Sequence, residues 1–249
     1  MSAAQAVAIF SAGIAAGTIN TVVGSGTLIT FPVLLAFGYA PVVANVSNTI
    51  GLVPGSVAGA VGYRRELRGQ LRRLARLACA SLTGGVIGAV LLLTLPASAF
   101  KAIVPGFIVN ALVAILFQNR LTALVGERRR AAGSHAGPVT LGAVLVCGVY
   151  GGYFGAAQGI MLLAILGLAL ADDLQRINAL KVALAGLVNL VAGVIFAFAA
   201  HVSWGPAGLL AAGSVLGGWL GARWGRRLPP AGLRAVIVAV GIVAIVRLV

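Results

Sequence analysis

The polar residues that could bind a ligand are few, and most lie at two glycine-rich breaks in an otherwise apolar chain. A helix that begins after each break would turn its free N–H groups and the positive end of its dipole toward the break. Such helix starts bind anions, and glycine lets the backbone approach a ligand closely. Tight packing through small residues is the alternative role of these glycines. The predicted ligand-binding residues are Asn20, Thr21, Gly24, Ser25, Gly26 and Thr27 at the first break, and Gln158 and Gly159 at the second.

One cation lies clearly inside an apolar run of the second half. Lys181 lies about two turns after a helix start. Its charge either has a function inside the membrane or is carried to the cytoplasmic interface by the long side chain. Asn189 lies two further turns along and is predicted to face the same cavity. Asn45 and Asn48 occupy the matching run of the first half, one turn apart, where hydrogen bonding between helices is the alternative role.

Other kinds of chemistry have little support. The two cysteines, Cys79 and Cys147, lie in apolar runs without metal-ligand spacing, and no Ser/His/Asp or Cys/His set exists, so an enzyme, a metal site and a cofactor are not expected. The only acidic residues are Glu66, Glu127, Asp172 and Asp173. None lies in mid-span, which leaves no carboxylate relay for protons. Asp172 and Asp173 are predicted to cap the helix that follows them.

Composition sets the class of protein. The chain of 249 residues is 60% hydrophobic and 9% charged, a balance that suits a bilayer and not a soluble domain. A formal net charge of +14 would fit nucleic acid, but the arginines lie in short loops between apolar runs, as the positive-inside rule requires. The expected partners are therefore the lipid bilayer and a small anion, with no nucleic acid.

The chain carries one membrane pattern twice. Gly13, Gly17 and Gly24 recur as Gly148, Gly152 and Gly159, each 135 residues later, and a second set that begins at Ser81 recurs from Ser214. Each half contributes five apolar runs. The runs lie at 4–23, 27–39, 42–62, 76–95 and 100–118, and at 138–156, 160–171, 174–200, 205–222 and 231–248. The second run of each half would rise only about 20 Å as a helix, short of a membrane span.

The arginine distribution predicts that the halves are inverted. The loops at 64–76 and 223–230 and the linker are arginine-rich and belong inside, whereas 199–205 has no Arg or Lys and belongs outside. Since 199–205 is the counterpart of 64–76, the two copies point in opposite directions, and both termini come out external. The predicted fold is an all-α polytopic membrane protein with two inverted repeats, 1–118 and 138–249, joined by a cytoplasmic linker at 119–137. Whether the short segments span or re-enter stays open.

Several segments resemble the TauE/SafE sulfite exporter family. They are Ala16–Leu34 around the first break, Ala44–Thr49, Gly62–Arg65, Gly151–Gly155, Asn178–Lys181 and Leu216–Arg223. Together they make the resemblance extend over nearly the whole chain. The family commonly has a Gly-Gly-Gly-like stretch where this chain has Gly24-Ser25-Gly26. The resemblance implies a bacterial permease for small sulfur oxyanions or organosulfonates, and for some members other carboxylates.

These observations predict a multi-pass transporter of the bacterial inner membrane. It would move a small anion, such as sulfite or an organosulfonate, by alternating access around the glycine breaks and Lys181. An uncoupled anion channel is the first alternative, and a membrane scaffold or enzyme the second. The substrate, the direction of transport, the coupling ion and the oligomeric state stay open, with a homodimer among the options.

Overall fold

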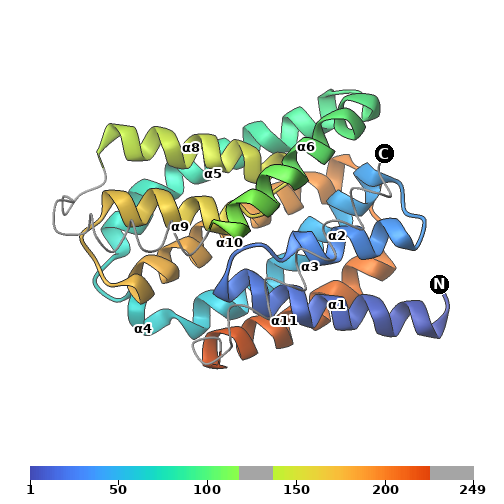
Figure 1. Cartoon of the computed structure of the whole chain (residues 1–249), viewed down its shortest axis with the longest axis horizontal. Coiled ribbons are helices and arrows are strands. Elements are labelled where there is room, and N and C mark those ends of the chain that lie inside the picture. Colours follow the sequence, from blue (N-terminus) through green and yellow to red (C-terminus); the bar gives the residue numbers. More distant parts are fainter. Residues whose placement is uncertain (118–136, 225–249) are drawn as a thin grey trace.

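The computed structural model describes residues 1–117 and 137–224, and this part of the chain is helical without strands. Its helices are α1 (Ala3–Val22), α2 (Thr27–Ala36), α3 (Pro41–Gly62), α4 (Arg64–Leu67), α5 (Leu71–Thr94), α6 (Ala97–Leu116), α8 (Pro138–Tyr153), α9 (Gln158–Ala169), α10 (Leu174–Ala199) and α11 (Trp204–Trp224) (Figure 1). The predicted linker up to residue 136, the inside turn beyond residue 224 and the last apolar run lie outside the described residues.

Four of these helices, α1, α5, α6 and α10, are long and apolar enough to cross a membrane, and α2, α8 and α9 are shorter apolar helices. Large apolar side chains also face outward, with Phe198 of α10 91% exposed and Val146 of α8 64% exposed. A surface of this kind needs lipid against it. The chain is therefore a multi-pass membrane protein.

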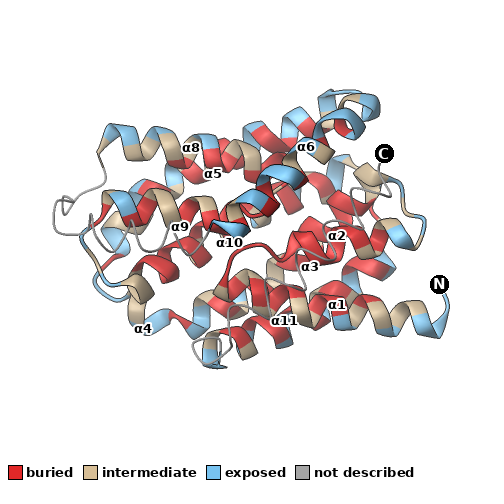
Figure 2. Cartoon of the chain, viewed as in Figure 1, coloured by how far each residue is buried: buried red, intermediate tan, exposed pale blue. Residues whose placement is uncertain are grey.

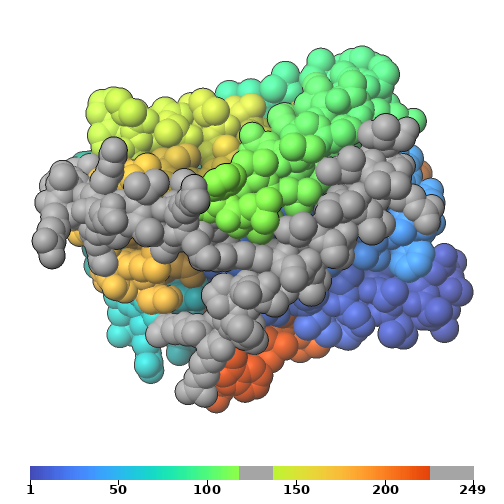
Figure 3. Space-filling view, in the orientation of Figure 1, coloured from blue at the N-terminus to red at the C-terminus, as the bar shows by residue number. Residues whose placement is uncertain are grey.

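Buried residues concentrate along the inward faces of the helices and around α2, α3 and α9 (Figure 2). The larger core cluster joins α2, α6 and the end of α8, where the rings of Phe31, Phe100 and Phe154 meet edge to face. In the space-filling view, α8 and α6 lie along one edge of the molecule and α1 along the opposite edge (Figure 3). The interior that these helices enclose contains the two glycine breaks.

The helix boundaries agree with the apolar runs to within a few residues, except at the start of α5. The sequence predicted a loop at 64–76, but α4 occupies 64–67 and α5 already begins at Leu71, so Arg72, Arg73 and Arg76 lie on a helix. Arginine is a good helix former, and its long side chain carries the charge to the interface from a helical position. The predicted loop is thus largely helical.

Caps account for where two of the helices begin. Ser2 and Gln5 form a reciprocal capping box at α1, with Gln5 N donating to Ser2 Oγ and Ser2 N donating to Gln5 Oε1. Asp173 is the N-cap of α10, where its carboxylate accepts from Gln175 N at 3.1 Å. The prediction that this acidic pair caps the next helix is confirmed for Asp173.

Glycines allow two helix pairs to pack with their backbones in contact. Helix α1 packs on α11 and α8 on α5, and α11 and α5 also pack on α3 and α10 respectively. A Cβ added at Gly17 would lie 2.9 Å from the Cα of Ser214, and one at Gly148 would lie 3.2 Å from the Cα of Gly84. These glycines therefore serve close helix packing. The glycines at the breaks have a different setting.

Candidate functional site

The first break separates α1 from α2. Gly24 has φ of +96°, a conformation that an L side chain rarely adopts, and its N–H bonds back to Ile19 O at 2.9 Å. Gly26 then stands at the N-cap of α2, and no side chain caps the helix start there. Ser25 and Thr27 are buried. The chain thus ends one helix and starts another inside the protein, as the sequence predicted.

The second break, between α8 and α9, also has left-handed residues between the end of one helix and the start of the next, but the residue types differ. Gly155 has φ of +76°, and Ala157 at the N-cap of α9 also has a left-handed conformation, with φ of 60°. A left-handed alanine costs about 1–2 kcal/mol, so its surroundings must impose it. Gln158 opens α9 and is only 3% exposed.

The two breaks are in direct contact. Gly159 N donates to Gly24 O at 3.0 Å, and a Cβ at either glycine would overlap the Cα of the other. Gly24 and Gly159 occupy the same position in the two copies of the sequence pattern. The contact therefore joins equivalent positions of the two copies of the pattern.

Lys181 of α10 reaches the end of α1. Its ammonium donates to Asn20 O at 3.2 Å and to Thr21 O at 3.1 Å, and the residue is 0% exposed. Lys181 therefore does not extend its side chain to the protein surface, as the alternative interfacial role would require. Cations stabilise the carbonyl ends of helices, and here the cation comes from the other half of the chain. One turn earlier on α10, Asn178 Nδ2 also donates to Thr21 O, at 3.4 Å.

Asn45 of α3 has the corresponding role at the second break. Its Nδ2 donates to the carbonyl oxygen of Tyr153, the last residue of α8, at 2.9 Å. A side chain of the second half therefore caps α1, and a side chain of the first half caps α8. The helix end that leads into each break therefore accepts a hydrogen bond from the opposite half of the chain.

Several other predicted site residues already form hydrogen bonds within the protein. Asn48 accepts a hydrogen bond from Thr30 and donates to Thr27 Oγ1 at 3.3 Å, so it ties α3 to the start of α2. Thr21 Oγ1 donates to Gly17 O within α1. Asn20 is part-buried and its Nδ2 donates to Ser56 Oγ at 3.4 Å. Asn189, two turns beyond Lys181, is only part-buried, whereas Lys181 is fully enclosed.

Some polar atoms around the breaks are buried but form no hydrogen bond with the described residues. They are Ser25 Oγ, Asn45 Oδ1, Gln158 Nε2, Asn178 Oδ1 and the hydroxyl of Tyr153. Buried polar atoms normally have partners, and exceptions often mark places where water or a ligand binds. Asn178 and Tyr153 were not among the predicted site residues. Their positions in the sequence could have identified them, because Asn178 lies one helical turn before Lys181 and Tyr153 lies at the edge of the second break.

Charge around the breaks is positive. Lys181 and the starts of α2 and α9 contribute positive charge or dipole ends. The acidic residues in the described ranges, Glu66, Asp172 and Asp173, lie in α4 and the α9–α10 connection, away from the breaks. In the described chain, no acidic side chain lies at the breaks to balance these groups.

A cavity of about 530 Å³ lies beside the second break, between α5, α6, α8 and α9. Its walls include Leu95, Ile103, Phe107, Tyr150 and Tyr153. Because these walls are almost wholly apolar and several of their side chains face outward, the cavity suits hydrocarbon and not an inorganic anion.

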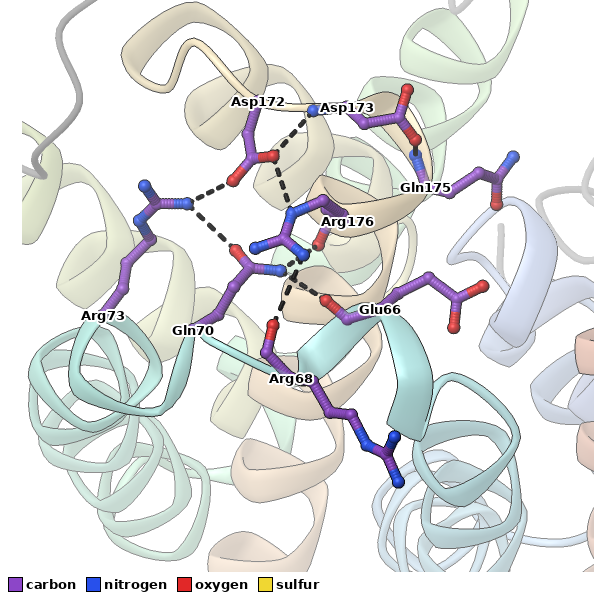
Figure 4. A network of polar contacts seen from close by, with 8 residues as sticks. All are labelled: Glu66, Arg68, Gln70, Arg73, Asp172, Asp173, Gln175 and Arg176. Carbon is purple, nitrogen blue, oxygen red and sulfur yellow. Dashed lines mark hydrogen bonds and ion pairs between the residues drawn. The ribbon is translucent and has the colours of Figure 1, made fainter.

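A second polar cluster joins the halves near α4 (Figure 4). Asp172 pairs with Arg73 of α5 at 2.6 Å and with Arg176 of α10 at 2.8 Å. Gln70 donates to Glu66 O and Arg176 O and accepts from Arg73. Burial acts to raise the pKa of Asp172, but the hydrogen bonds from Arg73 and the Asp173 backbone and the charge of Arg176 outweigh it and hold that pKa below its ordinary value. The carboxylate is thus kept ionised.

Comparison with known proteins assigns the chain to a family. The model of the sulfite exporter TauE/SafE family matches residues 9–248. The chain belongs to the TauE/SafE sulfite exporter family. No solved structure matches this family member significantly.

Relatives of this TauE/SafE member carry transporter names. A probable membrane transporter protein of Sinorhizobium sp is 28% identical over 96% of this chain and 90% of its own length. A probable membrane transporter protein of Haemophilus influenzae is 28% identical over 86% of this chain and 83% of its own. The probable membrane transporter protein YfcA of Escherichia coli is 26% identical over 88% of this chain and 79% of its own. Family and relatives together identify a membrane transporter.

Proposed function

We propose that this transporter moves a small anion, of the sulfur oxyanion or organosulfonate class, across the bacterial inner membrane by alternating access. The observation that carries the proposal is the contact between the two breaks at Gly24 and Gly159, with the buried Lys181 bonded to the end of α1 that leads into the first break. The first N–H groups of α9 already donate to backbone carbonyls, so the donors left for an anion are the side chains of Ser25 and Gln158. The dipole ends of the two helices and the cation favour negative charge near these donors. Membership of a sulfite exporter family supports sulfur chemistry for the substrate.

Two inverted repeats would supply the movement. Helices α1 and α8 occupy equivalent places in the sequence pattern, as do α11 and α5, and the pairs α1–α11 and α8–α5 are both in contact. In Figure 1, α1 runs from right to left and α8 from left to right. Opposed repeats around a shared site can exchange two arrangements, so that the site opens to one side at a time. The arginine-rich end at α4 would face the cytoplasm and the N-terminus the outside.

A channel would need a continuous pathway at the breaks. Ser25 and Gln158 are instead 1% and 3% exposed, and the backbones of the two halves touch between them. A closed site of this kind favours a carrier that passes through an occluded state. We therefore place alternating access ahead of an uncoupled pathway.

Counterflow in proteoliposomes tests the function. Vesicles loaded with unlabelled sulfite, thiosulfate or a sulfonate should accumulate the same labelled anion transiently and saturably. A purified-protein thermal-shift screen would choose the anion, since a ligand at 100 times its Kd adds about 2.7 kcal/mol of stability. Non-saturating flux would indicate a channel, and stabilisation by carboxylates alone would remove the sulfur-anion class.

A further inference from the structure

Two asparagine amides beside the breaks have fixed orientations. Asn45 Nδ2 donates to Tyr153 O at 2.9 Å, and Asn178 Nδ2 donates to Thr21 O at 3.4 Å. Flipping either amide would turn its carbonyl oxygen toward another carbonyl oxygen, which cannot donate. The two Oδ1 atoms are therefore the free ends of these side chains.

Both free ends are buried hydrogen-bond acceptors. Asn45 is 1% exposed and Asn178 is 7% exposed, and neither Oδ1 has a partner in residues 1–117 and 137–224. An amide oxygen only accepts, so the group that meets it must carry a hydrogen. Leaving such a buried acceptor unpaired is energetically costly.

Unpartnered donors lie in the same region. The Gln158 side chain packs against Gly151 in the last turn of α8, the turn whose end Asn45 caps. Ser25 and Gln158 are the chain neighbours of Gly24 and Gly159, whose backbones are in contact. The region thus offers donors, on Ser25 Oγ and Gln158 Nε2, together with fixed acceptors.

We propose that the transported anion also carries a hydrogen-bond donor. It is either an oxyanion that retains a proton or an organic anion with a hydroxyl or ammonium group. Its negative oxygens accept from Ser25 Oγ and Gln158 Nε2, and its own hydrogen is donated to Asn45 Oδ1. An anion without hydrogen would place a negative oxygen against that acceptor. This inference rests on the proposed anion site and narrows its substrate class.

A matched pair of sulfonates tests the organic form of the proposal. 2-Hydroxyethanesulfonate and ethanesulfonate have the same charged group, and only the first has a hydroxyl. Titration calorimetry of the purified protein should give at least tenfold tighter binding for the hydroxylated anion, or about 1.4 kcal/mol. Asn45→Leu should abolish this preference. Asn48→Leu is the control, and it should keep the preference because both ends of Asn48 are bonded to α2.

The inorganic form is tested with sulfite, across the pH range in which hydrogen sulfite loses its proton. Affinity should fall at least tenfold as the proton is lost. Methanesulfonate has no donor at any pH and is the reference. Cys147, Tyr150, Tyr153 and Lys181 are titratable groups near these amides in the described chain, and their titration also acts on the affinity for methanesulfonate. The ratio of the two affinities therefore reports the proton on the ligand.

The outcomes separate this inference from the proposed function. Equal binding of both sulfonates, with a sulfite-to-methanesulfonate ratio that does not change with pH, would overturn the donor requirement and leave an anion transporter. Failure of every anion to bind would overturn both proposals. If Asn45→Leu does not fold, the comparison of the two sulfonates on the unsubstituted protein decides, because equal binding there overturns the donor requirement.

Discussion

At the scale of single residues, a side chain can bind a ligand only where its hydrogen-bonding groups are not already bonded within the protein. Asn45 and Asn48 look alike in the sequence, one turn apart on α3. In the structure both ends of Asn48 are bonded to α2, whereas Asn45 keeps one free acceptor. Residue type and spacing therefore identify candidates, and the hydrogen bonds already formed separate those that hold the fold from those with capacity for a ligand.

The contact between Gly24 and Gly159 predicts the effect of one methyl group. Gly24→Ala should lower the free energy of unfolding by more than about 3 kcal/mol, the size of an over-packed buried contact added to left-handed strain. Gly38→Ala is the matched control, because Gly38 also has positive φ, at +86°, but a Cβ there meets nothing within 4 Å. Thermal unfolding in detergent compares the two. Equal losses would mean that strain alone, and not the contact between breaks, makes Gly24 necessary.

Lys181 is expected to affect both stability and binding. Lys181→Met leaves two carbonyl groups of α1 without their donor and removes the charge, so the unfolding free energy should fall by about 2 kcal/mol and anion affinity at least tenfold. Lys181→Gln should retain part of the stability but not the affinity. Lys101→Met, on the exposed start of α6, should change neither quantity. Binding isotherms and melting curves measure the effects, and unchanged affinity in Lys181→Met would confine the lysine to a structural role.

At the scale of helices, apolar runs and glycine positions predicted most boundaries. They predicted both breaks, since a run too short to span that follows a glycine cluster is typical of a discontinuous helix. They did not predict that Lys181 and Asn178 cap the carbonyl end of α1, because these residues lie about 160 positions from that helix end in the sequence. Nor did they locate the start of α5, because charge content alone does not distinguish an arginine-rich loop from a helix with arginines on it.

The Asp172 cluster between the α4–α5 and α9–α10 connections predicts a pH effect. The pKa of Asp172 is lowered in the folded protein, so its contribution is complete above the unfolded value and is lost as pH falls through the lower folded value. Stability should therefore decline below about pH 4. Asp172→Asn should remove about 2 kcal/mol at neutral pH and flatten that decline.

A double-mutant cycle with Arg176→Gln checks that the Asp172 effect comes from the pair. The combined loss should be smaller than the sum of the single losses by about 0.5 kcal/mol or more, as is typical of residues in contact. Denaturant titrations at neutral and acidic pH measure all four proteins. Strict additivity would show that the ion pair of Asp172 and Arg176 contributes nothing to stability.

At the scale of the whole molecule, the end with α4 and the connection between α10 and α11 lie at opposite ends of the helices (Figure 1). The inverted arrangement predicts that these ends face opposite sides of the membrane. Leu71→Cys and His201→Cys, both at exposed positions, are placed singly on a background that lacks Cys79 and Cys147. An impermeant thiol reagent applied outside cells should label only His201→Cys. Labelling of both from the same side would contradict the inverted repeats.

The reciprocal caps have a consequence for biosynthesis. When the ribosome has released only the first half, the carbonyl end of α1 lacks the donors that α10 will bring, and Asn45 lacks the helix end that it will cap. Unsatisfied backbone groups are costly in lipid, so the nascent first half should remain unfinished until α10 enters the membrane. Neither half alone is then expected to satisfy its own helix ends. A quality-control protease that samples open helix ends would have a long interval, during the synthesis of α5 to α9, in which to act.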